Sequence, residues 1–558
     1  MSTWILQTIY DSDSAYQADK DSLRKHIEAH SPDLKTRITS LQEAGMLLQE
    51  LEAYIECRMA QQTDDRGAQA EKVSLNSLRV LYEGGLFDLG AQLEDLDEPA
   101  FQNLIEELPE ISFFLKELRH LAAKRGSEGQ EKVIQALVSD GYHAYWSLYQ
   151  SFTGKMRIGD LSVSQAYNLL SDPDRKIREQ AFADWSKAWK KESDFLAQIL
   201  NHLAGFRLGV YGVRGWDSIL HEPLAMNRME EATLNSMLNA INEAKPMLIR
   251  YLEKKAQLLG LKKLSWFDVE SPLNGATLST WESACDTILS AFQAFHPQKA
   301  AFVRECFDKK WIDAEDREGK AAGGFCLQFP KSKQSRIFMT YKGTPINVAT
   351  LAHELGHAYH NRCVEHLPYF HQQMQMNVAE TASTFGEMVV IDQSIANCST
   401  DKERRFLLDD KLQRTVVYFM NLQARLLFEK AFYAERKKGF VTADRLSKLM
   451  VEAQKEAFGD ALADWDPLFW ASKLHFFYTD YPFYNFPYTF GYLLSNGLYA
   501  RAKEGGFGSR FDAFLVDTAQ MTVEDLAQKH LGVDLRTPSF WRESVGILVQ
   551  DIETFLSL

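Results

Sequence analysis

The sequence predicts a mainly α-helical protein with one small β-sheet. Apolar residues recur at helical spacing over residues 34–59 and 230–259. A further helical pattern covers residues 98–124, with a break at Pro109. Extended patterns are short by comparison, as at residues 336–341 (RIFMTY). We therefore expect packed helices to form most of the core.

The chain has 558 residues, of which 45% are hydrophobic and 25% charged, so it can form several domains with a deep core. We expect an N-terminal helical region at residues 1–110, a second helical region at 111–200 and a main domain at 201–558. Residues 151–163 (SFTGKMRIGDLSV) predict short extended pieces and turns. Residues 263–273 (KLSWFDVESPL) predict a strand followed by a turn.

Charge and composition argue against several classes of partner. The formal net charge is -14 and no basic stretch stands out, which disfavours a nucleic-acid partner. No run of about twenty apolar residues would span a membrane. The first residues lack the features of a secretory signal, and the six cysteines have no paired spacing. We therefore expect a cytoplasmic protein with reduced thiols and without a nucleic-acid or membrane partner.

The strongest functional signal is in residues 350–360 (TLAHELGHAYH), which contain His353, Glu354 and His357 in the order His-Glu-x-x-His. Two histidines four residues apart project from one face of an α-helix and can bind the same metal ion. Glu354 follows His353 on the helix, where a general base for hydrolysis is wanted next to the metal. The pattern indicates metal-assisted cleavage of an amide.

Residues before the motif support a helix there. The strand expected at residues 336–341 is followed by a turn, with Thr344 as N-cap and Pro345 as the first helical residue. Gly356 leaves room for a neighbouring helix. The alternative interpretation is a buried helix whose histidines simply bond to carboxylates.

A catalytic zinc usually has three protein ligands, so a third must lie elsewhere. Residues 376–393 (MNVAETASTFGEMVVIDQ) predict a helix with Glu380 and Glu387 on one face. We expect Glu380 to be the third ligand of one Zn²⁺ per chain, and Glu387 to orient a ligand histidine or to form an ordinary salt bridge. His360 competes with Glu380, but three ligands from one straight helix would strain tetrahedral geometry.

Several other polar residues are weaker candidates for a metal site. Two neighbouring residues lie in the loop expected at residues 215–226, and three more lie in the turn around Pro368. The first group is His221 and Glu222, and the second is Glu365, His366 and His371.

Gly323 and Gly324 are candidate substrate-binding residues. They precede the strand expected at residues 336–341 and could belong to a small sheet beside the motif helix. A peptide could add to the edge of such a sheet, which requires small residues for close approach. An ordinary glycine-rich turn is an equally good interpretation.

Residues 475–492 (HFFYTDYPFYNFPYTFGY) are unusually rich in aromatic side chains. Most of these rings should belong to the core. Hydrolysis also needs donors for the oxyanion that forms at the attacked carbonyl, and His475, Tyr484 and Tyr488 are candidates. Pro487 should begin a helix, with Tyr484 before it and Tyr488 in its first turn.

The HELGH motif, VAETASTFGE at residues 378–387 and the segment with a histidine followed by tyrosines together resemble the oligoendopeptidase F branch of the thimet oligopeptidase family of zinc metallopeptidases. The resemblance implies two largely helical halves that enclose a deep substrate channel. It also implies internal cleavage of short, unfolded peptides in the cytoplasm. On this likeness residues 111–200 correspond to an N-terminal oligopeptidase region and residues 201–558 to the catalytic domain.

The resemblance also assigns a role to each matching residue. It implies that His353, His357 and Glu380 are the zinc ligands and that Glu354 is the general base. It also implies that His475 and Tyr488 donate hydrogen bonds to the transition state and that Tyr484 contacts the substrate. The chain departs from the family pattern by a few extra residues between His475 and Tyr484, and by Gly491 and Tyr492 near an expected tyrosine. A zinc carboxypeptidase of similar fold and a non-catalytic helical scaffold are the alternative functions.

Overall fold

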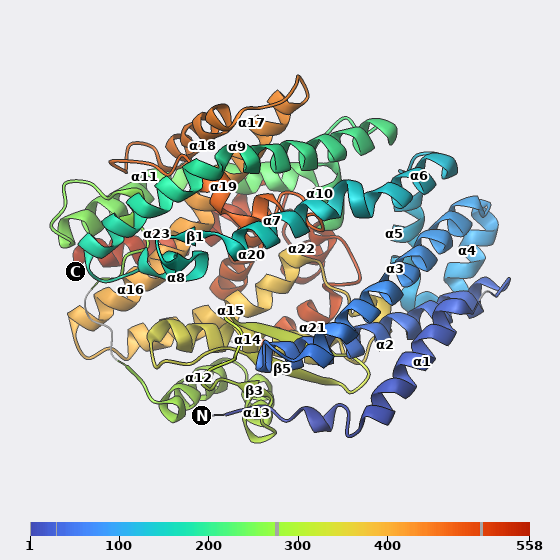
Figure 1. The fold of residues 1–558 in the computed structure, drawn as a ribbon. Coiled ribbons are helices and arrows are strands. Elements are labelled where there is room, and N and C mark those ends of the chain that lie inside the picture. Colours follow the sequence, from blue (N-terminus) through green and yellow to red (C-terminus); the bar gives the residue numbers. More distant parts are fainter. Residues whose placement is uncertain (1, 30, 274–277, 503–505) are drawn as a thin grey trace. The chain divides into compact units, whose positions relative to one another are not determined.

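The computed structural model describes residues 2–29, 31–273, 278–502 and 506–558 (Figure 1). It is mainly helical with small sheets, which confirms the predicted fold class. The chain divides into two compact units, and each unit is assembled from segments that are separate in the sequence. Unit 1 contains Met1–Arg125, Thr277–Ala396 and Arg501–Gly532, and unit 2 contains Gly126–Ala276, Asn397–Ala500 and Val533–Leu558.

Unit 1 consists of helices and a small sheet. The helices are α1 (Asp13–Glu28), α2 (Leu34–Gln61), α3 (Arg66–Asp95), α4 (Glu98–Glu107), α5 (Ser112–Ala122), α12 (Trp281–Phe295), α13 (Pro297–Asp308), α14 (Pro345–Val364), α15 (Met376–Ala396), α21 (Gly508–Asp517) and α22 (Val523–Leu531). Helices α1, α2 and α3 run side by side in Figure 1 and share one apolar core. Leu41, Leu51 and Leu89 are buried in it, as their helical spacing predicts.

The sheet of unit 1 consists of β3 (Ile312–Asp313), β4 (Phe325–Phe329) and β5 (Gln334–Phe338), in the order β3-β5-β4. Strand β4 is antiparallel to β5, and β3 is parallel to it. The carboxylate of Glu50, on α2, accepts hydrogen bonds from the backbone N–H groups of Lys331 (3.0 Å) and Ser332 (3.2 Å) in the turn between β4 and β5. Both strands contact α14, so the small sheet predicted beside the motif helix is present.

Unit 2 is also helical. Its elements are α6 (Glu128–Val138), α7 (Ala144–Lys155), β1 (Arg157–Ile158), β2 (Leu161–Ser162), α8 (Val163–Leu169), α9 (Arg175–Val213), α10 (His221–Met226), α11 (Glu231–Leu258), α16 (Asp401–Val416), α17 (Leu422–Arg436), α18 (Ala443–Phe458), α19 (Phe469–Ser472), α20 (Phe486–Ala502, whose last turn reaches unit 1) and α23 (Pro538–Ser557). Strands β1 and β2 form the extended pieces predicted at residues 151–163. Helix α9 continues without interruption through residue 200.

The strand predicted at residues 263–273 is wrong. Residues Trp266–Asp268 form a 3-10 helix, and only Leu264 makes an isolated β-bridge there. The reason is a capping box, because the Ser265 N–H donates to the Asp268 carboxylate (3.1 Å) and closes the turn. Within the described ranges, no helix is both long and apolar enough to cross a membrane.

Candidate active site

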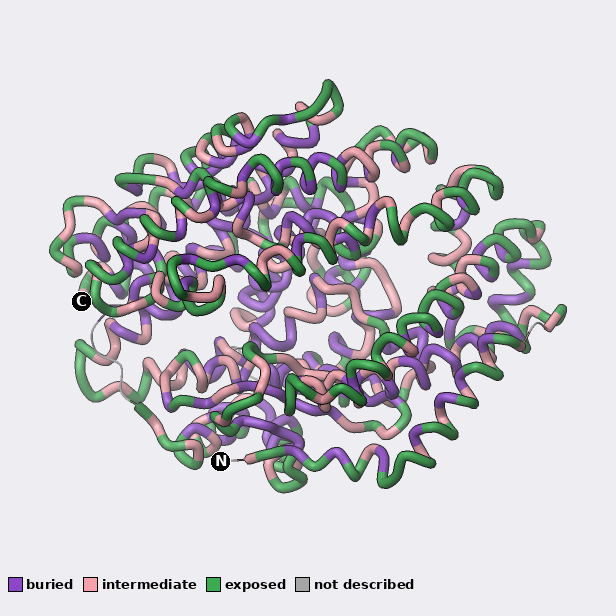
Figure 2. The backbone as a smooth tube through the Cα atoms, in the orientation of Figure 1, coloured by how far each residue is buried: buried purple, intermediate pink, exposed green. Residues whose placement is uncertain are grey.

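Helix α14 carries the His-Glu-x-x-His motif and begins where the sequence predicts. Thr344 is its N-cap, Pro345 is its first residue, and a capping box joins Thr344 and Asn347. The Thr344 hydroxyl accepts a hydrogen bond from the Asn347 N–H (3.3 Å). Figure 2 shows α14 and α15 buried over much of their length. A buried, capped helix holds the motif side chains on a rigid support.

Two glycines allow α14 and α15 to pack backbone against backbone. A Cβ atom on Gly356 of α14 would lie 2.5 Å from the carbonyl oxygen of Ala382 and 2.6 Å from the Cα of Ser383. A Cβ atom on Gly386 of α15 would lie 2.7 Å from the carbonyl oxygen of Ala352. Only glycine fits at such distances, so this pair of residues brings the side chains of the two helices within reach of each other.

The two motif histidines converge with Glu380 of α15. The Nε2 atoms of His353 and His357 are 3.2 Å apart. The Oε2 atom of Glu380 lies 3.4 Å from Nε2 of His353 and 3.9 Å from Nε2 of His357. The three ligand atoms lie within 4.8 Å of one another, as they would around a single ion. A set of two imidazoles and one carboxylate is a common catalytic zinc site.

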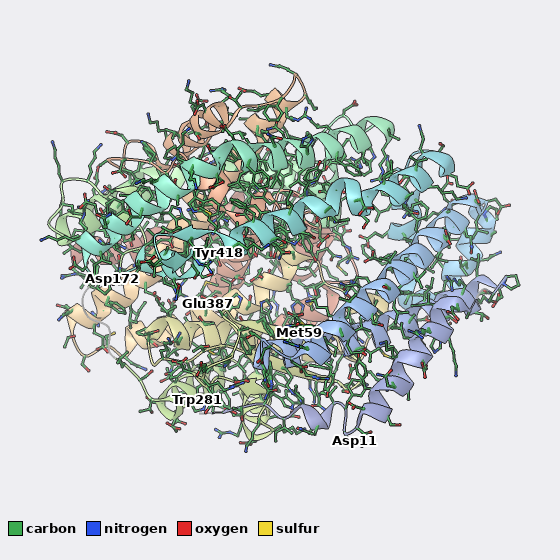
Figure 3. All side chains as sticks on the ribbon, in the orientation of Figure 1. Asp11, Met59, Asp172, Trp281, Glu387 and Tyr418 are labelled. Carbon is green, nitrogen blue, oxygen red and sulfur yellow. The ribbon has the colours of Figure 1, made fainter. Side chains whose placement is uncertain are left out.

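A second layer of contacts orients these three groups. Glu387, labelled in Figure 3, approaches Nδ1 of His353 to 2.5 Å through its Oε1 atom. This leaves Nε2 of His353 directed at the candidate metal position, and it is the contact expected of Glu387 from the sequence. The Ser383 hydroxyl lies 3.1 Å from the Glu380 carboxylate and 3.0 Å from the Glu380 carbonyl oxygen, so its proton can be donated to either of them.

The charged groups of the site strongly influence one another's pKa values. Burial lowers the pKa of His353, but the hydrogen bond and the charge of Glu387 outweigh this and raise it to about 10. Burial and the neighbouring His353 lower the pKa of His357 to about 3. Burial raises the pKa of Glu354 to about 7, because its charged form loses solvation. Glu354 is 6% exposed, so nearly all of its contacts are with protein.

His360 does not join the group. Its Nε2 atom lies 2.8 Å from the Thr518 hydroxyl and 3.2 Å from the Leu515 carbonyl oxygen, next to α21. Its imidazole therefore faces a different helix from the one that carries Glu380. Among the weaker candidates, Glu365 binds the guanidinium of Arg362 at 2.7 Å.

The other weak pair lies in unit 2 and is also engaged in local contacts. Glu222 accepts a hydrogen bond from the Tyr211 hydroxyl at 2.5 Å. The ring of His221 lies 4.6 Å from that of Trp216, centroid to centroid. Both side chains are thus accounted for by packing within α9, α10 and the loop between them.

Gly323 and Gly324 lie at the start of β4, which is an edge strand of its sheet. Gly323 has a φ of 103°, a conformation that other residues rarely adopt. A Cβ atom on Gly324 would lie 3.6 Å from the Oε1 atom of Glu354 and 3.5 Å from Cγ2 of Thr350. The structure therefore brings Gly324 beside the candidate general base.

His475, Tyr484 and Tyr488 lie together within unit 2. The Tyr488 hydroxyl donates to the Tyr484 hydroxyl at 2.7 Å, and the His475 ring stacks on that of Tyr484 with centroids 4.9 Å apart. Burial and the nearby Arg425 lower the pKa of His475 to about 2, so its imidazole is neutral. Tyr488 lies in the first turn of α20, as predicted from Pro487.

Two contributors to the site had no place in the sequence-based expectations. Gly386 had a visible signal, because a glycine inside a helix that also carries candidate ligands indicates close packing. Ser383 follows Glu380 by three residues, a spacing that permits a hydrogen bond on one helix face. Both lie on α15 and act on the position of Glu380.

The chain is similar to known proteins along most of its length. The sequence model of peptidase family M3 matches residues 168–515, which is more than half of the chain. "Oligopeptidase PepF" from Bacillus subtilis (strain 168) is 23% identical over 571 residues, covering 96% of this chain and 84% of the relative. "Oligoendopeptidase F homolog" from Lactococcus lactis subsp. lactis (strain IL1403) is 22% identical, covering 91% of this chain and 89% of the relative.

Solved structures share the fold along the whole chain. Oligoendopeptidase-F from Enterococcus faecium superposes with a TM-score of 0.70 at 18% identity, covering 99% of both chains. The structure described as PZ peptidase A with inhibitor 2 gives a TM-score of 0.75 at 15% identity, covering 97% of both chains. At these identities the likeness shows a common fold.

Proposed function

Because the chain belongs to peptidase family M3, we propose that it is a zinc-dependent oligoendopeptidase that cleaves internal bonds of short, unfolded peptides. The observation that carries the proposal is the convergence of His353, His357 and Glu380 on one point, with Glu354 on the same helix. The family itself establishes a peptidase that acts on peptides. Zinc, internal cleavage and the residue roles below are the proposed part.

His353, His357 and Glu380 would hold one zinc ion. The donor atoms already converge, and the contact with Glu387 leaves Nε2 of His353 available for the metal. The two imidazoles face each other with their Nε2 atoms 3.2 Å apart beside a carboxylate, an arrangement that a divalent cation would stabilise. When bound, zinc supplies Lewis acidity, which polarises a carbonyl and lowers the pKa of a water molecule.

Glu354 is the proposed general base. It accepts a proton from the attacking water and returns it to the leaving amine, so the carboxylate ends the cycle as it began. Its burial holds its pKa near 7, where a carboxyl group can both accept and return a proton. Gly324, where a Cβ atom would lie 3.6 Å from this carboxylate, leaves space for the scissile bond.

His475 and Tyr488 are the proposed donors to the oxyanion, and Tyr484 a proposed substrate contact, on the strength of the family likeness. Their chemistry suits the task, because a phenol hydroxyl and a neutral imidazole N–H can each donate a hydrogen bond. The hydrogen bond between Tyr488 and Tyr484 supports a common role for the two rings. Along β4, Gly323 and Gly324 are proposed to admit the peptide backbone at the edge of the sheet.

The decisive test combines metal content with cleavage of an internally quenched peptide that is blocked at both ends. We expect one zinc per chain and internal cleavage that a chelator abolishes and added zinc restores. Glu354→Gln should keep the zinc and lose activity by about 10³-fold or more. Glu365→Gln, at the C-cap of the same helix, is the matched control and should retain full activity.

Other outcomes would point elsewhere. Zinc without cleavage of blocked peptides, but with release of single C-terminal residues, would indicate a carboxypeptidase. Wild-type hydrolysis by Glu354→Gln would refute the assignment of the base. We also propose that the protein acts in the cytoplasm, in keeping with its six cysteines being unpaired thiols.

A further inference from the structure

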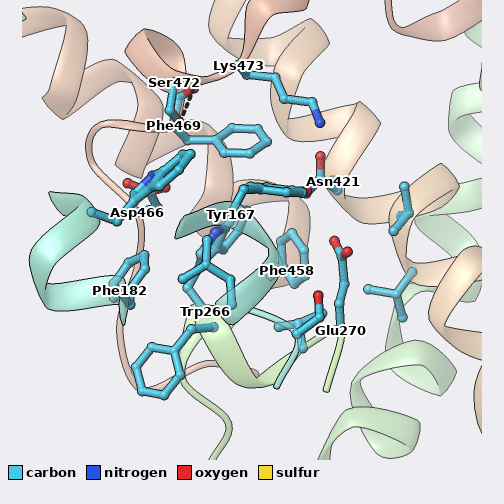
Figure 4. Close-up of a pocket in the computed structure, with 17 residues that line it drawn as sticks. Tyr167, Phe182, Trp266, Glu270, Asn421, Phe458, Asp466, Phe469, Ser472 and Lys473 are labelled. Atoms are coloured by element: carbon cyan, nitrogen blue, oxygen red, sulfur yellow. Dashed lines mark hydrogen bonds between the residues drawn. The ribbon is translucent and has the colours of Figure 1, made fainter. Parts of the chain in front are cut away.

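Unit 2 contains a cavity of about 80 Å³ that the proposed chemistry does not use (Figure 4). At roughly 15 Å³ for each water it has room for about five waters, which suits one residue and not a length of peptide. Rings of Tyr167, Trp266 and Phe458 line one side. Trp266 and Phe458 meet at 61° with centroids 5.5 Å apart, so they contact each other edge to face and form a continuous aromatic wall.

Polar side chains line the side that faces these rings. Figure 4 shows Lys473, Asn421 and Glu270 directed at the same part of the cavity. Among the described residues, neither the side chain of Lys473 nor that of Glu270 forms a hydrogen bond or an ion pair. The ammonium of Lys473 lies 5.9 Å from the centroid of the Phe469 ring. A lysine and a glutamate that line one cavity without pairing leave both charges available to a ligand.

A second cation stands behind this polar wall. The Nε atom of Arg425, which is 5% exposed, donates to Oδ1 of Asn421 at 2.8 Å. Burial and the charge of Arg425 lower the pKa of Lys473 to about 7, while Glu270 opposes that shift. When Lys473 is protonated, it and Arg425 outnumber the carboxylate of Glu270, while burial raises the pKa of Asp466, the other acidic group in the lining, to about 7. An anion bound there would raise the pKa of Lys473 and neutralise the excess.

We propose that this cavity binds an aromatic residue that carries a free α-carboxylate. The ring would pack against this aromatic wall, and the carboxylate would accept hydrogen bonds from Lys473 and from the amide of Asn421. The ligand could be a free aromatic amino acid or the C-terminal residue of a short peptide. Glu270 separates these sources, because the ammonium of the amino acid offers it a charged partner, whereas a peptide amide offers only one uncharged N–H donor.

Binding here does not depend on the proposed hydrolysis, because every residue involved belongs to unit 2 and no metal is required. The full chain is titrated by calorimetry with L-phenylalanine, N-acetyl-L-phenylalanine and L-phenylalaninamide. We expect saturable binding of both acids and at least tenfold weaker binding of the amide, which lacks the carboxylate. Tighter binding of phenylalanine identifies the free amino acid as ligand, and tighter binding of the acetylated acid identifies a peptide C-terminus.

Variants assign the binding to the cavity. Lys473→Met should weaken binding of both acids by about tenfold to a hundredfold, and Tyr167→Ala, at a side chain that is 49% exposed, should also weaken it. The matched controls Lys176→Met and Glu253→Gln, at exposed positions outside the cavity, should not change it. Circular dichroism checks that each variant is folded. Equal binding of the amide, an unchanged affinity in Lys473→Met, or no binding of either acid would overturn the proposal.

Discussion

Replacing Gly356 with alanine tests whether the contact between α14 and α15 determines the metal site. The added Cβ atom would stand 2.5 Å from the carbonyl oxygen of Ala382 and 2.6 Å from the Cα of Ser383. Both neighbours are backbone atoms of a buried helix and cannot rotate away. To reach ordinary contact distance the helices must separate by roughly 0.5 to 1 Å, which moves Glu380 away from the histidines.

The energy of this change has two opposing parts. Overpacking at a buried site typically lowers the free energy of unfolding by about 1 to 3 kcal/mol. Because the added atom meets rigid backbone here, we expect a value near the upper end of that range. Replacing glycine with alanine inside a helix raises the free energy of unfolding by about 1 kcal/mol through helix propensity. We therefore expect Gly356→Ala to lower the free energy of unfolding by about 2 kcal/mol. We also expect it to weaken zinc binding by about tenfold or more, because its ligands come from both helices.

The matched control is Gly84→Ala. Gly84 lies inside α3, and a Cβ atom there would meet nothing within 4 Å. The free energy of unfolding of this variant should rise by up to about 1 kcal/mol from helix propensity alone, and its zinc affinity should equal that of the wild type. Urea unfolding and zinc titration against a competing chelator measure both quantities. If Gly356→Ala were as stable as Gly84→Ala and bound zinc as tightly as the wild type, the reasoning from helix contact would be refuted.

Three further predictions follow from the same unit. Glu387→Gln should weaken zinc binding by about 10- to 100-fold in a chelator competition, because it loses the charged partner of His353. Burial lowers the pKa of Lys299 from 10.5 to about 7. As the pH falls, Lys299 is therefore protonated in the unfolded chain before it is protonated in the folded protein. As the pH falls from about 10 to 7, this group should therefore lower the free energy of unfolding by up to about 1.4 kcal/mol per pH unit, and Lys299→Met should reduce the slope measured by urea unfolding by that amount. Gly324→Val should retain zinc, measured by metal analysis, but lose activity, because its side chain would occupy the space beside Glu354; activity equal to the wild type would contradict this.

Local signals made much of the site predictable. Thr344 and Pro345 mark a helix start within two residues, and the spacing of His353 and His357 determines a shared helix face. Glu380 was predictable as a carboxylate on the next amphipathic helix, and the structure places it beside both histidines. Each of these signals lies within a single helical segment of the sequence.

What the sequence did not reveal depends on contacts between distant segments. The segment around Trp266 has the apolar pattern of a strand, but Ser265 and Asp268 close a turn instead. Arg178 then pairs with Asp268 from another helix at 2.8 Å. The cavity lined by Tyr167 and Lys473 likewise joins segments about three hundred residues apart, for which no periodicity in the sequence gives a signal.

The candidate metal ligands and the carboxylate behind them all lie between residues 353 and 387. Closing so short a loop costs little chain entropy, so a helical hairpin of α14 and α15 could assemble the ligand set before the remainder of unit 1 is folded. A metal ion that binds such a partly folded chain stabilises the native state by less than its affinity implies. The ion would then act mainly as a template that selects the register of the two helices during folding.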